Sequence, residues 1–333
     1  MNNTFLSHIS LLRVVAMVTV VLHHTLCFYG AWFPYEGSQA YLNFTMALKE
    51  ISMPMFIALA GFIYSYLRMN HGKYNNTGTF VLSKTKRLLL PYLLWSAILL
   101  TPLNLAEAQP INVLYGIWHL WFLLVLFLEF MFFHLTFRFW GKVSKIADCA
   151  IFVMLFAASH LIIKFVDSHG IDIRCFCLYL FIRYIPFFYL GAALGKSRFN
   201  IKPAVIPAIA VLIGSAAVVV IWLFFNDVKG AATINHLLTA MIIVAAIPAA
   251  DSFCKRFPTI ASSKIITDLD KSSMGIYILH HILILDFVSL PIGAEFMNEH
   301  VILAPVAVFA VSLLLSWAMT HAILRTRLRF VFG

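Results

Sequence analysis

The sequence predicts an all-α integral membrane protein: a polytopic bundle of about ten transmembrane helices with both termini in the cytoplasm. Three observations predict this fold class. Hydrophobic residues make up 62% of the 333 residues and charged residues only 11%, whereas soluble domains carry about 25% charged residues. Long apolar stretches recur along the whole chain, and lysine and arginine gather in alternate loops.

The apolar stretches are long enough to cross a bilayer, which requires about 20 mostly apolar residues. They are continuous runs, which favours helices over the alternating strands of a barrel. The expected spans are 9–29, 47–68, 88–103, 117–137, 146–166, 177–195, 204–225, 233–250, 273–290 and 301–324. No stretch between them is polar and long enough for a separate soluble domain, so residues 1–333 are expected to form a single transmembrane domain.

The distribution of basic residues predicts the orientation of these spans. The loops after even-numbered spans, together with the C-terminal tail, hold most of the 24 lysines and arginines, and the other loops hold only Arg174 and Lys229. Because basic loops stay in the cytoplasm, both termini are expected there. The formal net charge of +10 therefore marks the inner face, where anionic headgroups lie, and requires no nucleic acid partner.

Two ionisable residues share one face of the first expected span. An ionisable group at the centre of a span costs about 2.5–3.5 kcal/mol, so such groups usually face a cavity or a partner. Arg13 and His24 are eleven residues apart, which leaves them about 20° from alignment, while His23 is rotated by about 100°. A basic residue near the inner mouth suits an anionic ligand, and a histidine suits proton transfer. The alternative is a positive-inside anchor at Arg13 and a packed polar residue at His24.

Further candidate residues lie in three other stretches. His280 and His281 form a second adjacent pair in the ninth expected span. Neighbouring histidines of a helix point about 100° apart and do not chelate as i, i+4 pairs do, so no metal is expected. His119 lies beside tryptophans at the outer end of the fourth span, from which it could reach an outer cavity.

A basic run precedes the third expected span. Lys84 and Arg87 are three residues apart, with Lys86 between them, and are expected to share a helical face. Such a pair can grip phosphates, the arginine through a bidentate fork and the lysine as a point charge. The alternative is that these are ordinary positive-inside residues.

Six short motifs occur in order along the chain. They are RVVAMVTVVLHH (R-x10-H, with Arg13 and His24), ISMPMFIALAGFIYSYL, FVLSKTKRLLLPYLLWS, WHLWFL (with His119), YIPFFYLGAALG and SSMGIYILHH (Ser-x-Gly-Ile-Tyr-x-x-His, ending at His280). In this order, on a chain of about ten spans, they resemble the membrane-bound acyltransferase 3 family, which O-acetylates bacterial surface polysaccharides and related acceptors. Two positions depart from the family pattern: Ala60 replaces the more usual serine, and Lys84 replaces the more usual arginine.

The resemblance implies an enzyme that moves an acetyl group from cytoplasmic acetyl-CoA to a hydroxyl of a surface carbohydrate or glycolipid acceptor. It also implies a multi-pass protein of the bacterial inner membrane, of the stand-alone type. The partners expected from it are acyl-CoA, the carbohydrate or glycolipid acceptor and membrane lipids.

The resemblance and the residue chemistry together suggest roles for the candidates. His24 is expected to be the general base on the acceptor hydroxyl or, alternatively, an acyl carrier. His119 and His280 are expected to support the oxyanion or bind the acceptor. The cations expected to hold the phosphates of polyanionic coenzyme A at the inner mouth are Arg13, Lys84, Lys86 and Arg87.

Two other functions use the same kinds of residue. A proton-coupled transporter or flippase of a lipid-linked or small-molecule substrate could use Glu129, Lys164, Arg183 and the histidines as a proton relay. Against it, the sequence has no evident inverted repeat and no paired broken helices. A haem-binding redox protein would need histidine pairs across helices.

Overall fold

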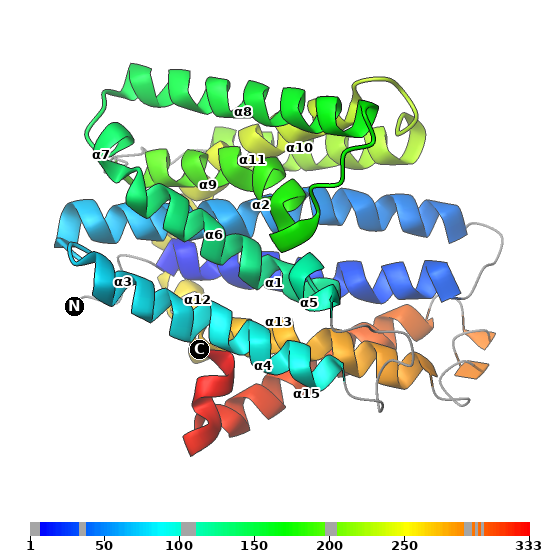
Figure 1. The fold of residues 1–333 in the computed structure, drawn as a ribbon. Helices are drawn as coiled ribbons and strands as arrows, with labels where there is room; N and C mark the ends of the chain where they lie inside the picture. The colour runs from blue at the N-terminus through cyan, green and yellow to red at the C-terminus, as the bar shows by residue number, and fades with distance from the viewer. Residues whose placement is uncertain are drawn as a thin grey trace. The chain divides into compact units, whose positions relative to one another are not determined.

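The computed structural model describes residues 7–32, 38–100, 111–196, 205–289, 295–296, 299–300 and 303–333. Within these ranges the chain forms helices and no strand, which confirms the all-α prediction (Figure 1). Eight of the described helices are long and apolar enough to cross a membrane. The third and ninth expected spans are helical as well, in α4 (Leu90–Leu99) and α13 (Lys264–Ser289). Residues 101–103, at the end of the third expected span, lie outside the described ranges.

The chain divides into two compact units, and each is described by itself. Unit 1 comprises Met1–Phe56 and Phe199–Thr326, and unit 2 comprises Ile57–Arg198 and Arg327–Gly333. Helix α2 (Ser38–His71) contributes its first half to unit 1 and its second half to unit 2. The expectation of a single transmembrane domain stays a prediction.

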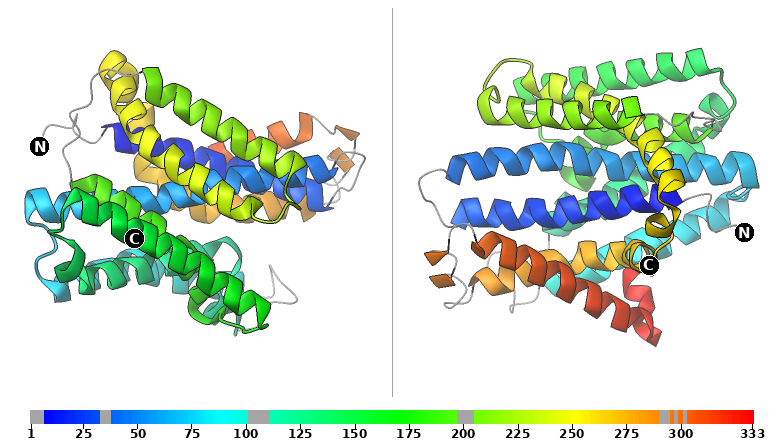
Figure 2. Two further views of the ribbon diagram at one scale, coloured as in Figure 1. Left: turned by 90° about the horizontal axis from the view of Figure 1, so that it is seen from above. Right: turned by 180° about the vertical axis from the view of Figure 1, so that it is seen from behind.

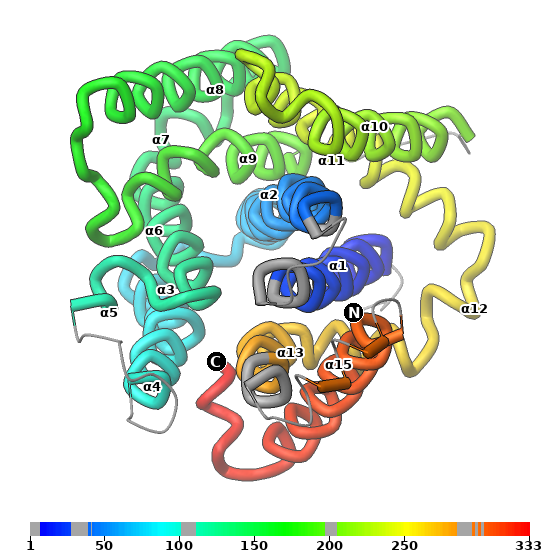
Figure 3. Tube along the Cα trace, turned by 90° about the vertical axis from the view of Figure 1, so that its right-hand side faces the viewer, coloured from blue at the N-terminus to red at the C-terminus, as the bar shows by residue number. Residues whose placement is uncertain are grey.

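Unit 1 is organised around α1 (Ser7–Trp32), which packs against α11 (Ala231–Arg256), α13 and α15 (Leu303–Leu324) (Figure 3). Helices α10 (Val205–Phe224) and α11 lie side by side (Figure 2). Met17 and Val21 of α1 and Ile276 of α13 are buried together. A Cβ on Gly275 would lie 2.3 Å from Cγ2 of Thr320, so this glycine permits the close approach of α13 to α15. Unit 1 also contains α12 (Pro258–Ala261).

Unit 2 holds the middle of the chain and its last helical turn. Trp95 of α4 anchors that turn: its ring stacks on Phe332 at 5.9 Å, and its Nε1 donates to the carbonyl of Val331 at 2.9 Å. The helical segments of unit 2 besides α2 and α4 are α3 (Thr77–Lys84), the π-helix η1 (Thr85–Leu89), α5 (Asn112–Tyr115), η2 (Trp118–Leu120), α6 (Trp121–Leu135), α7 (Phe137–Trp140), α8 (Lys145–Ser168), η3 (Cys175–Cys177), α9 (Leu178–Lys196) and η4 (Arg327–Phe332).

Three glycines bring the backbones of α2 and α9 into contact within unit 2. A Cβ on Gly191 would lie 1.7 Å from the carbonyl oxygen of Ala58, and one on Gly195 would lie 2.4 Å from that of Phe62. From the other side, a Cβ on Gly61 would lie 2.1 Å from the carbonyl oxygen of Phe188. Small residues at this Gly-x-x-x-Gly spacing let membrane helices approach closely, where packing rather than a hydrophobic driving force holds them together.

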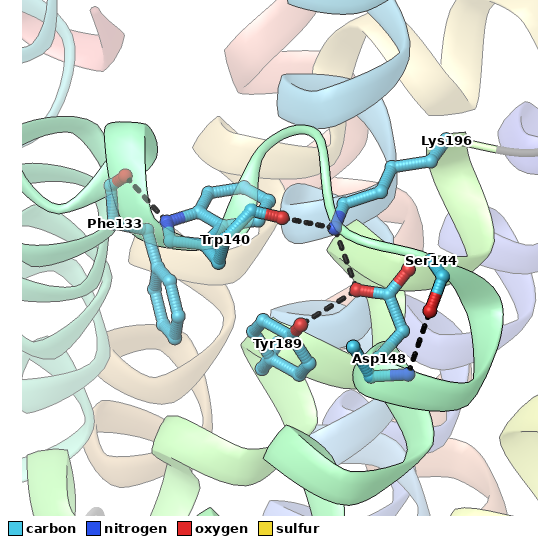
Figure 4. A network of polar contacts seen from close by, with 7 residues as sticks. Phe133, Trp140, Ser144, Asp148, Tyr189 and Lys196 are labelled. Carbon is cyan, nitrogen blue, oxygen red and sulfur yellow. Dashed lines mark hydrogen bonds and ion pairs between the residues drawn. The ribbon is translucent and has the colours of Figure 1, made fainter.

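A buried polar network joins the start of α8 to the end of α9 (Figure 4). Oδ1 of Asp148 accepts from Nζ of Lys196 and from the hydroxyl of Tyr189, each at 2.6 Å. Lys196 also donates to the carbonyl of Trp140 at 2.5 Å. Oγ of Ser144 caps α8 by accepting from the amide of Ala147 at 3.2 Å. The network satisfies both charges of the pair, so neither is left alone in an apolar environment.

Candidate active site

Two polar pairs connect α1 with α13 in unit 1. Arg13 Nη2 lies 2.6 Å from Oδ2 of Asp270, and Nδ1 of His24 lies 2.9 Å from Nε2 of His280. The two partners on α1 are eleven residues apart and those on α13 are ten apart, or about 16 Å and about 15 Å along each helix axis. The helices therefore run parallel, as the first and ninth spans do in a ten-span topology. The structure confirms that Arg13 and His24 share a face of α1.

The two histidine pairs of the sequence meet in one cluster. The ring centre of His24 lies 4.8 Å from that of His23, 5.0 Å from that of His280 and 4.9 Å from that of His281. His24 is partly exposed, whereas the other three rings are buried. Despite the four imidazoles, no group of three or more histidine, cysteine or acidic residues in the described ranges is arranged to hold a metal ion. The cluster therefore contains one partly exposed imidazole and three enclosed ones.

The hydrogen bonds of His280 and His24 indicate which ring nitrogen of each carries the proton. Nδ1 of His280 lies 2.8 Å from the carbonyl oxygen of Ile276, which can only accept, so this nitrogen is the N–H of His280. In the neutral ring Nε2 of His280 is then an acceptor, and Nδ1 of His24 donates to it across 2.9 Å. The basic nitrogen of His24 is consequently Nε2.

His23 serves a different contact, as its rotation on the helix predicts. Its Nδ1 donates to the carbonyl of Thr45 at 2.8 Å, on the first half of α2. A second buried contact of that helix half is the pair between Oε2 of Glu50 and Nε2 of His236, 3.1 Å apart. These contacts fix α1 and α11 against α2 within unit 1.

Asp270 was missed by the sequence reasoning. Its side chain is 11% exposed and that of Arg13 is 28% exposed, so the pair is partly buried. The signal for it was present in the spacing, because Asp270 precedes His280 by nearly the interval that separates Arg13 from His24. The charge of Arg13 is neutralised by this partner, which makes Arg13 a contact between helices as well as a cation.

Lys84 is enclosed by aromatic rings in unit 2. Its Nζ lies 3.5 Å from the ring centre of Phe130, 5.4 Å from that of Tyr74 and 5.5 Å from that of Phe80. A cation over ring faces is stabilised by the quadrupoles of those rings. In the described part of the chain Lys84 forms no ion pair. Burial, together with the charges of Arg87 and Lys73, lowers the pKa of Lys84 to about 7.

A polar contact holds the helix that carries Lys84. Nη1 of Arg68 donates to Nδ1 of His134 at 2.7 Å and to the hydroxyl of Tyr64 at 2.5 Å. The remaining ring nitrogen of His134, Nε2, is then its N–H and donates to Oγ1 of Thr77 at 3.1 Å. The ring of His134 also stacks on Phe80 at 4.0 Å. Since Thr77 and Phe80 lie on α3 with Lys84, His134 docks that helix against α6.

A π-helical segment, Thr85–Leu89, follows α3 and ends two residues before Pro91. Pro91 has no N–H, so the carbonyl of Arg87 cannot receive its α-helical hydrogen bond. The amide of Leu90, just before this proline, bonds the carbonyl of Thr85, five residues back. Such segments widen the helical turn and are frequent at functional sites.

The three basic candidates in and beside the π segment differ in exposure. Lys84 is buried, whereas Lys86 and Arg87 are exposed. Lys84 and Arg87 therefore differ in exposure, and the joint phosphate grip expected of them stays a prediction. Their charges still influence one another, because Arg87 contributes to the lowered pKa of Lys84.

His119 lies on η2, the turn that leads into α6 in unit 2, and is 3% exposed. The ring of Trp121 next to it stacks on Tyr184 of α9 at 5.6 Å. The structure thus brings together His24 and His280 in unit 1, while His119 and the basic candidates of the third expected span belong to unit 2. The contact of His119 with an outer cavity stays a prediction.

Comparison with known families identifies the chain. A family model described as an acyltransferase domain matches residues 6–321, which is nearly the whole chain. The protein belongs to the acyltransferase 3 family. No match was found in comparisons with curated proteins or with solved structures. As an acyltransferase 3 protein it is a multi-pass membrane acyltransferase.

Four of the six motifs of this acyltransferase fall into two kinds by the contacts they make. The glycine-containing segments around Gly61 and Gly191 serve helix packing. Two histidines, from the first and last of the six motifs, meet as the pair of His24 and His280. An acyltransferase needs a base for its nucleophile, and of the histidine pairs described above this one combines a defined basic nitrogen with partial exposure.

Proposed function

We propose that this acyltransferase moves an acetyl group from acetyl-CoA to a hydroxyl of a surface carbohydrate or glycolipid, with His24 as the general base. The bond between His24 and His280 carries the proposal, because it leaves Nε2 of the partly exposed ring as the basic nitrogen. The bacterial inner membrane is the location that agrees with this reaction, since donor and acceptor would lie on opposite sides of the bilayer.

The proton has a complete path in this reaction. Nε2 of His24 takes the proton of the acceptor hydroxyl while its oxygen attacks the thioester carbonyl and forms the new C–O bond. The C–S bond then breaks, and the thiolate of coenzyme A takes the same proton from Nε2. General acid–base help of this kind contributes about 10²–10⁴-fold to a rate.

The donor site is proposed at the basic run of unit 2. Lys84 fits an anionic ligand because it is a buried amino group with no ion pair in the described part of the chain. Lys86 and Arg87 are exposed beside it and would contact phosphates from the surface. Arg13, which has Asp270 as its partner, is assigned to the positioning of α1 against α13. His119 remains a candidate for oxyanion support or acceptor binding.

The test uses purified protein in lipid bilayers with acetyl-CoA and a glycan extract from a cell envelope. Release of free thiol and an added acetyl mass on the glycan are measured together. His24→Ala should abolish most of both, whereas His23→Asn should leave them near wild-type, because asparagine can keep the bond to Thr45. Equal activity of the two variants would refute His24 as the base.

One observation favours the alternative of a proton-coupled transporter or flippase. Both carboxyl oxygens of Glu129 are buried and lack a hydrogen-bond partner within the described ranges. Buried acids inside membranes often belong to proton pathways. The same bilayer sample separates the two functions: thiol release with glycan acetylation supports the enzyme, and movement of substrate without acetylation supports the transporter.

A further inference from the structure

His280 is enclosed at the interface of α1 and α13, and its surroundings restrict both the orientation and the tautomer of its ring. The side chain has no exposed area. One ring nitrogen, Nδ1, faces the carbonyl of Ile276 in its own helix at 2.8 Å, and the other, Nε2, faces His24 at 2.9 Å. A ring held at both nitrogens can neither flip nor exchange its tautomer without losing one of these hydrogen bonds.

We propose that His280 is a positioning residue that keeps His24 in the Nδ1–H tautomer and so directs its basic Nε2 at the acceptor hydroxyl. This inference rests on the proposed function for its catalytic consequence, although the tautomer itself does not depend on it. The role differs from oxyanion support or acceptor binding, because His280 acts only through His24 and touches neither substrate.

The chain of donors explains why a histidine serves here. The carbonyl of Ile276 fixes Nδ1–H of His280, which makes Nε2 an acceptor, and this acceptor fixes Nδ1–H of His24. When His24 takes the proton of the hydroxyl, its Nδ1–H bond to His280 becomes charge-assisted and therefore stronger. In serine hydrolases a buried aspartate holds the catalytic histidine in this way, and loss of the correct tautomer there costs about 10⁴-fold. A neutral imidazole gives the same orientation without a second charge in the membrane.

His281 provides a matched control on the same helix. Its ring centre is as close to His24, at 4.9 Å, but the two rings meet edge to face. Its replacement therefore removes a neighbouring imidazole while the bond between His24 and His280 remains. A requirement for imidazole packing alone would affect both positions equally.

The decisive measurement is the tautomer of His24 in the wild-type protein in lipid bilayers. All 13 histidines are labelled with ¹⁵N, and the His24 signals are assigned by their loss in His24→Ala. Protonated and unprotonated ring nitrogens resonate in separate spectral regions, so the state of each nitrogen can be read directly. We expect a protonated Nδ1 and an unprotonated Nε2; the opposite tautomer would overturn the inference even if His24 proved essential.

Three variants then test the consequence. In His280→Gln the amide oxygen can replace Nε2 as acceptor, whereas in His280→Asn the shorter side chain reaches only the Ile276 carbonyl. We expect His280→Asn to lose the tautomer and to lower kcat by about 10²–10⁴-fold, with KM for acetyl-CoA unchanged. His280→Gln should keep the tautomer and restore kcat to within about tenfold, and His281→Gln should resemble wild-type.

Failure of this inference can be distinguished from failure of the proposed function. If the wild-type protein shows the expected tautomer but His24→Ala keeps full activity, the general-base role of His24 is refuted. The role of His280 in orienting the ring is not refuted by that result. Equal losses of kcat in His280→Gln and His280→Asn, with the tautomer retained in both, would refute the positioning role. Thermal unfolding of each variant shows whether a lost activity reflects a lost fold.

Discussion

Arg13 of α1 donates to Asp270 of α13 across 2.6 Å, and the same two helices carry the bonded pair of His24 and His280. Both pairs lie on one face of α1, so the ion pair and the imidazole pair share a single interface. Both pairs are consistent with one register of the two helices.

The first prediction separates a positioning role of Arg13 from phosphate binding. Asp270→Asn leaves the guanidinium in place but without its carboxylate. If Arg13 only positions α1, Arg13→Gln and Asp270→Asn should lower kcat alike and destabilise the fold by about 1–3 kcal/mol each. A lower KM for acetyl-CoA in Asp270→Asn would instead show that the released guanidinium binds the donor. Steady-state kinetics and thermal unfolding provide both values.

The second prediction concerns pH and Lys84. Its pKa of about 7 lies below the ordinary 10.5 because burial disfavours the ammonium. An anionic donor binds the ammonium, so KM for acetyl-CoA should rise as pH increases above about 7. Lys84→Arg should flatten this dependence because a guanidinium stays charged. The same pH dependence in both proteins would contradict a role for Lys84 in donor binding.

The same lowered pKa affects stability. The folded state carries the full cost of the buried ammonium below about pH 7, and this cost disappears as pH rises from about 7 toward 10.5. Lys84→Met should therefore stabilise the protein at pH 6 more than at pH 9. Thermal unfolding at the two pH values measures the difference, and an equal effect at both would contradict the lowered pKa.

The fourth prediction concerns the contact between α2 and α9. Gly191→Ala places a Cβ 1.7 Å from the carbonyl oxygen of Ala58, and backbone atoms cannot yield as a flexible side chain can. We expect a loss of about 1–3 kcal/mol or more, with little folded protein recovered. Gly78→Ala is the control, because its Cβ meets nothing closer than Oδ1 of Asn76 at 3.4 Å. Equal yields of the two variants would contradict the close contact.

The fifth prediction compares two ion pairs. The side chains of Lys196 and Asp148 are 9% and 12% exposed, so Lys196→Met leaves a buried carboxylate and should cost about 3–5 kcal/mol. The pair of Lys255 and Asp251 is far more open, with the lysine 63% exposed. Lys255→Met should cost about 1 kcal/mol or less. Similar shifts in Tm for the two variants would show that the Asp148 network contributes little.

The spans were predictable from the sequence because insertion into lipid depends on local apolar length, and each expected span contains a helix. The orientation of neighbouring residues on α1 was predictable from helical geometry. His23 and His24 differ by the fixed angle between successive residues of a helix, and they contact different partners. Where a helix is regular, the spacing of residues in the sequence therefore predicts the relative directions of their side chains.

Contacts between distant helices were not predictable, since they depend on packing. The sequence showed two histidine pairs but not that His24 would meet His280, and Asp270 gave only a spacing as its signal. The burial of Lys84 required knowledge of Phe130 on another helix. The π segment at Thr85–Leu89 was not predicted either, because the spacing argument for Lys84 and Arg87 assumed a regular α-helix there.

The parallel course of α1 and α13 also limits how the chain can change in length. One residue inserted between Arg13 and His24 would turn the imidazole by about 100° around the helix and shift it by about 1.5 Å, away from its partner. A compensating insertion in α13 could restore the match in position along the helix axes. It would not restore the directions in which the two imidazoles point. Insertions and deletions should therefore be tolerated in the loops and rejected within these two intervals, even where every side chain named here is retained.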